Sequence, residues 1–396
     1  MTRVCIEAPD SGRRGFLKSA AVAGGMMLFP LLASGCAPFS RFLRDDSLSS
    51  DGWPLERKLA QMLMPGFPGE KIQENSPIAA HIRDYGVGGV VLFDNDPLLQ
   101  VTDRNITSPE QLFSLAGSLM GLSSTPLFIA VDQEGGRDAS LKERNGFPPT
   151  ASARSLGSSG SPAATEAAAE KIAATLASAG INLNLAPVVD LDINPLNQVI
   201  GGKERSFSSD PATVSAHARA FIKGHHRHRL ATCIKHFPGH GSSSTDSHLG
   251  LVDVTDTWSE SELIPYREII SSGLCDMVMT AHTFNRNIDR DFPATLSRAT
   301  IDGILRKRLN FNGMVLSDDL YMGAIARNYS KEFAVEMAVN AGVDMLIIAN
   351  DKVYEPDMIP RTIELLALKV RTGAITEERI NQACGRIMAV KRKYLS

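Results

Sequence analysis

Short apolar runs alternate with longer stretches of mixed polarity through most of the chain. Eight of these runs have the length and composition of buried strands. They cover residues 61–66, 87–93, 127–131, 181–186, 231–236, 276–281, 313–317 and 343–348. The stretches between them have the spacing of amphipathic helices, an alternation typical of βα units. The pattern therefore predicts an α/β protein with a single (β/α)8, TIM-like barrel and no second domain.

Three of the mixed stretches show clear helix ends. Residues 163–179 are rich in alanine and are followed by Gly180, and residues 330–341 are followed by Gly342. Glycine readily takes the left-handed conformation with which many helices end. Residues 375–394 are expected to form a closing helix, with a threonine before two glutamates as a cap and a basic end that suits the helix dipole.

The N-terminus has the pattern of an export signal. Arg13 and Arg14 precede an apolar run over residues 20–32 and the sequence Ala33-Ser34-Gly35-Cys36. A twin arginine marks export of an already folded protein. The last four residues resemble the lipobox at which bacterial lipoproteins are cut and acylated on cysteine, and an uncleaved anchor is the alternative.

These features divide the chain into three parts: a signal peptide over residues 1–35, a lipidated Cys36 with a tether over residues 36–52, and the barrel domain over residues 53–396. We expect an exported monomer in the bacterial periplasm or cell envelope, attached to the membrane by the lipid alone. The sequence distinguishes neither the inner from the outer membrane nor one membrane leaflet from the other.

Charge and cysteine content exclude a nucleic-acid-binding protein and a disulfide-stabilised one. The net charge is −3 for 396 residues, and removal of the signal peptide leaves −5, which gives no footprint for nucleic acid. Of the five cysteines, two lie near the N-terminus and the other three lack metal-ligand spacing. No disulfide framework is expected.

A polar segment follows the fifth predicted strand. Residues 235–248 read Lys-His-Phe-Pro-Gly-His-Gly-Ser-Ser-Ser-Thr-Asp-Ser-His, with five ionisable side chains and almost nothing to bury. Glycine and serine disfavour a stable helix or strand, so we expect an active-site loop. A solvated surface loop and a metal-binding tract are the alternatives.

Polar residues also follow other predicted strands. Residues 132–137 follow the third strand, Lys235 and His236 end the fifth, His282 ends the sixth, and residues 318–319 end the seventh. In a barrel these positions meet at the carboxyl face, where catalytic groups collect. One face is therefore expected to hold an active site.

Five motifs at these positions resemble those of glycoside hydrolase family 3, in its β-N-acetylglucosaminidase branch. They are Val131-Asp132-Gln133-Glu134-Gly135-Gly136-Arg137, Glu204-Arg205-Ser206-Phe207, Lys235-His236-Phe237-Pro238-Gly239-His240-Gly241, Asp246-Ser247-His248 and Ser317-Asp318-Asp319-Leu320-Tyr321-Met322. The resemblance runs from about Trp53 to the C-terminus. It implies a barrel, a retaining double displacement, and neither a metal nor another cofactor.

By this resemblance Asp318 is the nucleophile, and His248 is the acid/base with Asp246 as its partner. A carboxylate at a strand end can reach an anomeric carbon. An imidazole can give a proton to the leaving oxygen and take one from water. Asp319 is expected to be a helix N-cap or the partner of a nearby base.

The resemblance also implies a substrate site for the non-reducing N-acetylglucosamine, formed by Asp132, Arg205, Lys235 and His236. Arg137 belongs to the same motif as Asp132 and is assigned to this site. Arg205 and Asp132 could instead form a structural ion pair, and Lys235 could neutralise neighbouring carboxylates.

Two segments depart from the family pattern. Asp138-Ala139-Ser140 stands where many relatives have a second arginine, and Ser242-Ser243 stands where Asp-Thr often follows Pro-Gly-His-Gly. The leaving-group preference is therefore left open.

The remaining histidines are expected to be structural or solvated. His225, His226 and His228 lie beside two arginines that would repel a cation, so a solvated helix end is expected. His240 is expected to be the structural pivot of its loop. His282 either lines the pocket or is a hydrogen-bonded barrel residue.

The sequence thus predicts a retaining exo-β-N-acetylglucosaminidase that acts on peptidoglycan fragments or chito-oligosaccharides through a covalent glycosyl-enzyme. One alternative, a metal-dependent amidohydrolase, lacks the His-x-His it needs at the end of the first strand. The others are a non-catalytic sugar-binding lipoprotein and a β-N-acetylglucosaminide phosphorylase.

Overall fold

The structure, a computed structural model, describes residues 50–97, 100–247, 250–351 and 353–396. All of these residues belong to a unit that spans residues 42–396. The expected signal peptide, Cys36 and most of the expected tether lie outside the described residues, and so does His248. Within the described ranges, no helix is both long and apolar enough to cross a membrane.

Parallel strands form the centre of the fold, and each overlaps one of the eight apolar runs predicted from the sequence. They are β1 (Leu63–Pro65), β2 (Gly89–Val91), β3 (Phe128–Val131), β6 (Leu183–Asn184), β7 (Ala231–Phe237), β9 (Met277–Thr280), β11 (Met314–Leu316) and β12 (Leu346–Ile348). Every residue of these strands is buried. Burial on both faces explains why the strands are continuous apolar runs rather than alternating ones.

The order of the strands follows the chain. Strands β2, β3, β6, β7, β9 and β11 pair in this order as a parallel sheet, and β1 pairs in parallel with β12. Single bridges join the two groups, from Gly66 to Val91 and from Leu316 to Met345. The sheet therefore curls until its first and last strands are neighbours.

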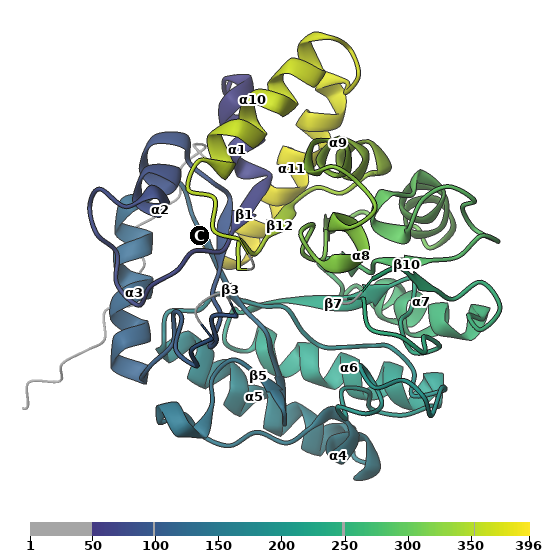
Figure 1. Cartoon of the computed structure of the whole chain (residues 1–396). Coiled ribbons are helices and arrows are strands. Elements are labelled where there is room, and N and C mark those ends of the chain that lie inside the picture. Colours follow the sequence, from purple (N-terminus) through teal and green to yellow (C-terminus); the bar gives the residue numbers. More distant parts are fainter. Residues whose placement is uncertain (1–49, 98–99, 248–249, 352) are drawn as a thin grey trace, which may run out of the picture. The chain divides into compact units, whose positions relative to one another are not determined.

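Helices connect the strands and lie on the outer side of the curled sheet (Figure 1). The longer helical segments are α1 (Leu55–Gln61), α3 (Pro109–Leu122), α5 (Pro162–Ser178), α6 (Pro211–His226), α7 (Ile264–Ser271), η6 (Ala299–Arg308), α9 (Lys331–Ala341), α10 (Met358–Arg371) and α11 (Glu377–Tyr394). Apolar side chains of the strands and of the inner helix faces form one continuous core.

Shorter elements lie in the connections. The helical ones are α2 (Pro77–Ala80), η2 (His81–Tyr85), η3 (Glu143–Asn145), α4 (Ala153–Ser158), η4 (Glu260–Leu263), η5 (Ala294–Leu296) and α8 (Gly323–Ala326). Two small strand pairs are β4 (Gln133–Gly135) with β5 (Asp138–Ala139), and β8 (Val252–Asp253) with β10 (Thr283–Phe284).

The predicted helix ends are confirmed. Gly180 follows α5 with a φ of 81°, and Gly342 ends α9 with a φ of 119°, both in the left-handed region. Before α11, Oγ1 of Thr376 accepts the backbone N–H of Arg379 at 3.2 Å. Each helix end thus carries the local signal that the sequence shows.

Candidate active site

A cavity of about 820 Å³ lies at the carboxyl ends of the strands. Strand ends of this kind supply the active sites of parallel α/β proteins. Six of the residues predicted from the sequence line the cavity: Asp132, Arg137, Arg205, Lys235, His236 and Asp318. The fold therefore brings together side chains that come from the connections after β3, β6 and β11 and from β7 itself.

Glu134 lies at the centre of the charged groups in this cavity. Its carboxylate oxygens accept hydrogen bonds from Nε and Nη2 of Arg205 at 2.8 and 2.7 Å, and Nζ of Lys235 lies 2.7 Å from Oε1. Burial alone would raise the pKa of Glu134, but Arg205 and Lys235 hold this pKa well below its ordinary range. The sequence prediction gives Glu134 no role, although it lies in the same motif as Asp132.

Asp132 pairs with Lys235 and not with Arg205. Nζ of Lys235 donates to Oδ1 of Asp132, and the side chain of Lys235 is 3% exposed whereas that of Asp132 is 37% exposed. The ion pair between Asp132 and Arg205 that the sequence leaves open does not form. Lys235 does neutralise two carboxylates, and the partly exposed Asp132 can accept a hydrogen bond from a ligand in the cavity.

His236 is held in one tautomer by two charged neighbours. Its Nδ1 lies 2.7 Å from Oδ2 of Asp190, and its Nε2 lies 3.3 Å from Nη2 of Arg205. A guanidinium only donates hydrogen bonds, so Nε2 is the acceptor and Nδ1 carries the proton. Asp190 is fully buried and follows β6 outside the five motifs, so the sequence does not single it out.

The segment after β7 is more buried than its composition predicts. Residues 235–243 are all buried, which contradicts the expectation that this stretch has almost nothing to bury. Its polar groups are buried because they find partners. The backbone N–H of His240 donates to Asp190 at 2.8 Å, and its Nδ1 lies 2.7 Å from Oγ of Ser243. Burial lowers the pKa of His240 to about 4, which agrees with a structural role.

Asp246 and Ser247 continue this segment. Asp246 is half-buried, and Ser247 is buried with its carbonyl accepting the backbone N–H of Ala324 at 3.0 Å. Ser247 lines the cavity, whereas Asp246 is not among the lining residues. Because His248 lies outside the described residues, its pairing with Asp246 stays a prediction.

Asp318 and Asp319 follow β11 and have different surroundings. Oδ1 of Asp318 accepts the backbone N–H of Asp319 at 2.8 Å. Oδ1 of Asp319 accepts the backbone N–H groups of Ala349 at 2.8 Å and Tyr321 at 3.2 Å. Asp319 therefore joins the ends of β11 and β12. This matches neither expected alternative, because its carboxylate bonds to backbone N–H groups and neither caps a helix nor pairs with a basic side chain among the described residues. Burial raises the pKa of Asp319 to about 7.

His282 is a hydrogen-bonded residue of the sheet interior. Its Nε2 donates to the carbonyl oxygen of Asp319 at 2.8 Å, and its Nδ1 lies 2.8 Å from Oγ1 of Thr295. His282 is fully buried and is not among the residues that line the cavity. Of the two alternatives for His282, the structure supports the structural one.

The segment that departs from the family pattern lies at the edge of the cavity. Arg137 is exposed, and Asp138 lies 3.6 Å from Nζ of Lys203 and 4.0 Å from Nε of Arg205. In place of a second arginine, this position adds a carboxylate between two cations.

The histidine tract at the end of α6 is only partly solvated. His225 is fully buried, with Nδ1 donating to the carbonyl oxygen of Phe221 and Nε2 accepting from Nδ2 of Asn184, both at 3.0 Å. The expectation of a solvated helix end is therefore wrong for His225. Across the described ranges, no group of histidine, cysteine, aspartate and glutamate could hold a metal ion.

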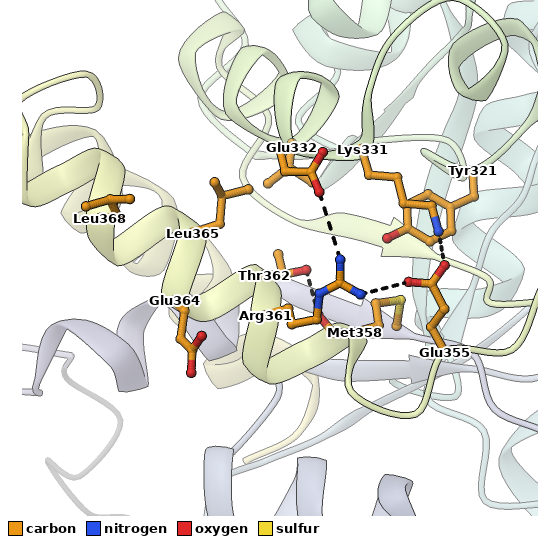
Figure 2. Close-up of a pocket in the computed structure, with 11 residues that line it drawn as sticks. Tyr321, Lys331, Glu332, Glu355, Met358, Arg361, Thr362, Glu364, Leu365 and Leu368 are labelled. Carbon is orange, nitrogen blue, oxygen red and sulfur yellow. Dashed lines mark hydrogen bonds and ion pairs between the residues drawn. The ribbon is translucent and has the colours of Figure 1, made fainter.

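A smaller hollow of about 330 Å³ lies between α9 and α10 (Figure 2). Its charged groups face one another: Lys331 pairs with Glu355, and Arg361 lies 3.5 Å from Glu355 and 4.0 Å from Glu332. Nζ of Lys331 also lies 4.2 Å from the ring centroid of Tyr321. Because Tyr321 lines this hollow, the hollow adjoins the segment that follows Asp318.

Comparisons with known proteins agree with this geometry. Residues 54–390 match the family described as "Glycosyl hydrolase family 3 N terminal domain". A Beta-hexosaminidase of Tolumonas auensis is 39% identical over 279 residues, which cover 68% of this chain and 78% of that protein. A Beta-hexosaminidase of Xylella fastidiosa is 37% identical over 276 residues, with the same coverage of 68% and 78%.

Solved structures resemble the fold over most of the chain. A glycoside hydrolase family 3 beta-N-acetylglucosaminidase from Paenibacillus sp. matches with a TM-score of 0.79 and 32% identity, over 86% of this chain and 63% of its own. The Beta-N-acetylhexosaminidase from Beutenbergia cavernae matches with a TM-score of 0.77 and 28% identity, over 86% of this chain and 98% of its own. The chain thus spans less than two thirds of the Paenibacillus protein but nearly all of the Beutenbergia one. With the matched motifs lining one cavity, the chain belongs to glycosyl hydrolase family 3.

Proposed function

We propose that the protein is a retaining exo-β-N-acetylglucosaminidase that hydrolyses terminal, non-reducing β-linked N-acetylglucosamine. The names of its relatives, Beta-hexosaminidase and beta-N-acetylglucosaminidase, support this activity. The observation that carries the proposal is the shared cavity of Asp318 with Asp132, Lys235 and His236. A nucleophile there faces a wall of polar groups that suits a substrate rich in hydroxyls.

Asp318 attacks the anomeric carbon and forms a covalent glycosyl-enzyme as the bond to the leaving oxygen breaks. His248 gives the leaving oxygen its proton, and Asp246 stabilises the imidazolium. His248 then takes a proton from water, which attacks the same carbon and frees Asp318. Two inversions retain the β configuration.

The non-reducing sugar is bound by Asp132, Lys235, Arg205 and His236, with Arg137 at the edge. Apart from the exposed Arg137, these groups are rigid before the substrate arrives, because each has a charged partner in the cavity wall. Preorganised donors and acceptors lose little freedom on binding, which favours both affinity and correct placement.

The curled sheet is that of a complete (β/α)8 barrel in a single domain over residues 53–396. The strand order and the two bridges between the strand groups support this proposal. The twin arginine, the apolar run and the lipobox-like sequence support export, removal of residues 1–35 and lipidation of Cys36. The monomer is thus tethered in the cell envelope, where peptidoglycan fragments are the proposed substrate and chito-oligosaccharides the alternative.

Product analysis tests the proposal. Muropeptides and chitobiose are incubated side by side with the enzyme, with and without inorganic phosphate, and products are followed by mass spectrometry and by NMR of the anomeric proton. We expect release of free N-acetylglucosamine, first as the β anomer, from at least one substrate. An α anomer would disprove retention, a sugar phosphate would establish phosphorolysis, and sugar binding without turnover would establish a non-catalytic lipoprotein.

A further inference from the structure

The polar segment that leads from β7 to Asp246 is fixed by side chains of neighbouring connections. We define residues 236–243 as the stem, and every residue in it is buried. Asn194 and Asn197, from the connection after β6, each donate their side-chain amide to two stem carbonyls at 2.8–3.0 Å. The accepting carbonyls belong to His240, Gly241, Ser242 and Ser243.

Glu262, in η4, supports the stem from another side. Its Oε2 accepts the backbone N–H of Gly241 at 2.9 Å, and the residue is only 1% exposed. Its Oε1 has no hydrogen-bond partner among the described residues. A carboxyl placed this deeply costs free energy unless it is hydrogen-bonded, and the bond from Gly241 offsets part of that cost. No step of the proposed reaction uses the Glu262 carboxyl.

The two stem glycines show how closely this support fits. A Cβ on Gly239 would lie 2.6 Å from a carboxylate oxygen of Glu262, and Gly239 has a φ of +129°. A Cβ on Gly241 would lie 1.9 Å from the carbonyl oxygen of Leu191. Neither place has room for a side chain, so the stem backbone lies directly against Glu262 and against the connection after β6.

The far side of Asp246 is also attached to the fold. The carbonyl of Ser247 accepts the backbone N–H of Ala324 in α8, the helix that follows Asp318 and Asp319. Asp246 therefore lies between the stem and a contact to the segment of the proposed nucleophile. Only two residues, 244 and 245, separate the stem from Asp246, so a shift of the stem would be transmitted to it.

We propose that Glu262 is a positioning residue for the acid/base pair: by accepting the N–H of Gly241, it fixes the stem and thereby the placement of Asp246. The inference rests on the proposed function, since it presumes that Asp246 and His248 act on the leaving oxygen. Glu262 itself touches neither the substrate nor the reacting atoms. Its effect should therefore appear only in the step that needs proton transfer.

The dependence of kcat/KM on the leaving group distinguishes a positioning role of Glu262 from a general effect on the stability of the protein. Phenyl N-acetyl-β-glucosaminide needs protonation of its leaving oxygen, whereas the 2,4-dinitrophenyl glycoside does not, and kcat/KM reports the first bond cleavage for both. For Glu262→Ala we expect kcat/KM to fall about tenfold or more on the phenyl substrate and to change less than about threefold on the dinitrophenyl substrate. Glu262→Gln keeps an acceptor oxygen and should stay close to wild type on both.

Two controls make the result decisive. Glu260 lies in the same η4 but is exposed and pairs with Arg308, so Glu260→Gln should leave both substrates unchanged. His248→Ala gives the reference pattern of a lost acid. If Glu262→Ala does not fold, Glu262→Asp, which withdraws the carboxylate by one methylene, replaces it.

An equal loss on both substrates, or a Glu262→Gln variant as impaired as Glu262→Ala, would overturn the positioning role. If His248→Ala itself shows no leaving-group dependence, the acid/base assignment fails instead, whatever the Glu262 variants do. A selective loss in Glu262→Ala together with the same pattern in His248→Ala supports both.

Discussion

Arg205 and Glu134 form a two-point ion pair inside the cavity, with Nε and Nη2 of the guanidinium donating to the two carboxylate oxygens at 2.8 and 2.7 Å. The side chains are 10% and 5% exposed, so water screens the pair little. The same carboxylate contacts Lys235, and the same guanidinium contacts His236. Glu134 thus sets the positions of three groups proposed to bind the sugar.

Glu134→Gln should lower the free energy of unfolding by about 3 kcal/mol at pH 7, because it removes the buried carboxylate that two cations share. Lys235 then keeps its pair with Asp132, and Arg205 keeps the more distant Asp138. The depressed pKa of Glu134 contributes stability that is full above the unfolded value of 4.5 and is lost as the pH falls through the folded value. The difference between wild type and variant should therefore narrow below pH 4.5. Urea denaturation between pH 3 and 7 measures it, with the exposed Glu364→Gln as control. A constant difference over this range would contradict the electrostatic explanation.

Asp318→Asn should fold normally and lose about 10³-fold or more in kcat/KM on an aryl N-acetyl-β-glucosaminide, because an amide cannot form the glycosyl-enzyme. The control is Asp256→Asn, at an exposed position outside the cavity. Thermal melts of both variants check the fold. Equal turnover by Asp318→Asn and wild type would show that another group is the nucleophile.

The eight strands could be predicted from the sequence because strands that are buried on both faces are mostly apolar along their length. The partners of the site residues could not. Glu134 and Arg205 are 71 positions apart, and Asp190 and His236 are 46 positions apart. Local patterns carry no information about which of several acids meets which base. Only the strand order decides that Lys235 meets Asp132 and Glu134.

The burial of His225 and of the stem also could not be predicted from the sequence. Both are polar in composition, and composition alone predicts exposure. His225 is buried because it lies on the inner face of α6, where its ring stacks on Phe221 with centroids 4.4 Å apart. The stem is buried because neighbouring connections supply a partner for its backbone groups. Tertiary hydrogen bonds, which the sequence pattern does not display, reverse the expectation in both places.

Asp319→Asn should stabilise the protein at neutral and alkaline pH. Burial raises the pKa of Asp319 from 3.8 to about 7, so the folded state keeps a proton that the unfolded chain has lost. Its contribution to stability therefore falls as the pH rises from 3.8 to about 7 and stays low above that. An asparagine keeps the Oδ1 acceptor for Ala349 and Tyr321 but cannot ionise.

Urea denaturation of wild type and Asp319→Asn at several pH values gives the measurement. The variant should gain stability relative to wild type as the pH rises, by on the order of 3 kcal/mol at pH 8. Near pH 4 the two proteins should be similar. A variant less stable at every pH would show that the ionised carboxylate is favourable in the folded state.

His225 should make the protein sensitive to mild acid. Burial lowers its pKa from 6.5 to about 3, so between these values the unfolded chain binds a proton that the folded state does not. The contribution of His225 to stability is full above pH 6.5 and is lost as the pH falls, at about 1.4 kcal/mol per pH unit.

His225→Gln, which does not titrate, should be less stable than wild type at pH 8 because it loses the stacking on Phe221. Its deficit should shrink by about 2 kcal/mol between pH 6.5 and 5. The half-exposed His228→Gln is the control. Nε2 of His225 bonds to the side-chain amide of Asn184, and this amide also bonds to the backbone N–H and carbonyl of Gln133, each at 3.0 Å. Loss of the bond between His225 and Asn184 should therefore also loosen the segment that contains Asp132. A deficit of His225→Gln that stays constant down to pH 5 would show that the buried imidazole accepts a proton without cost.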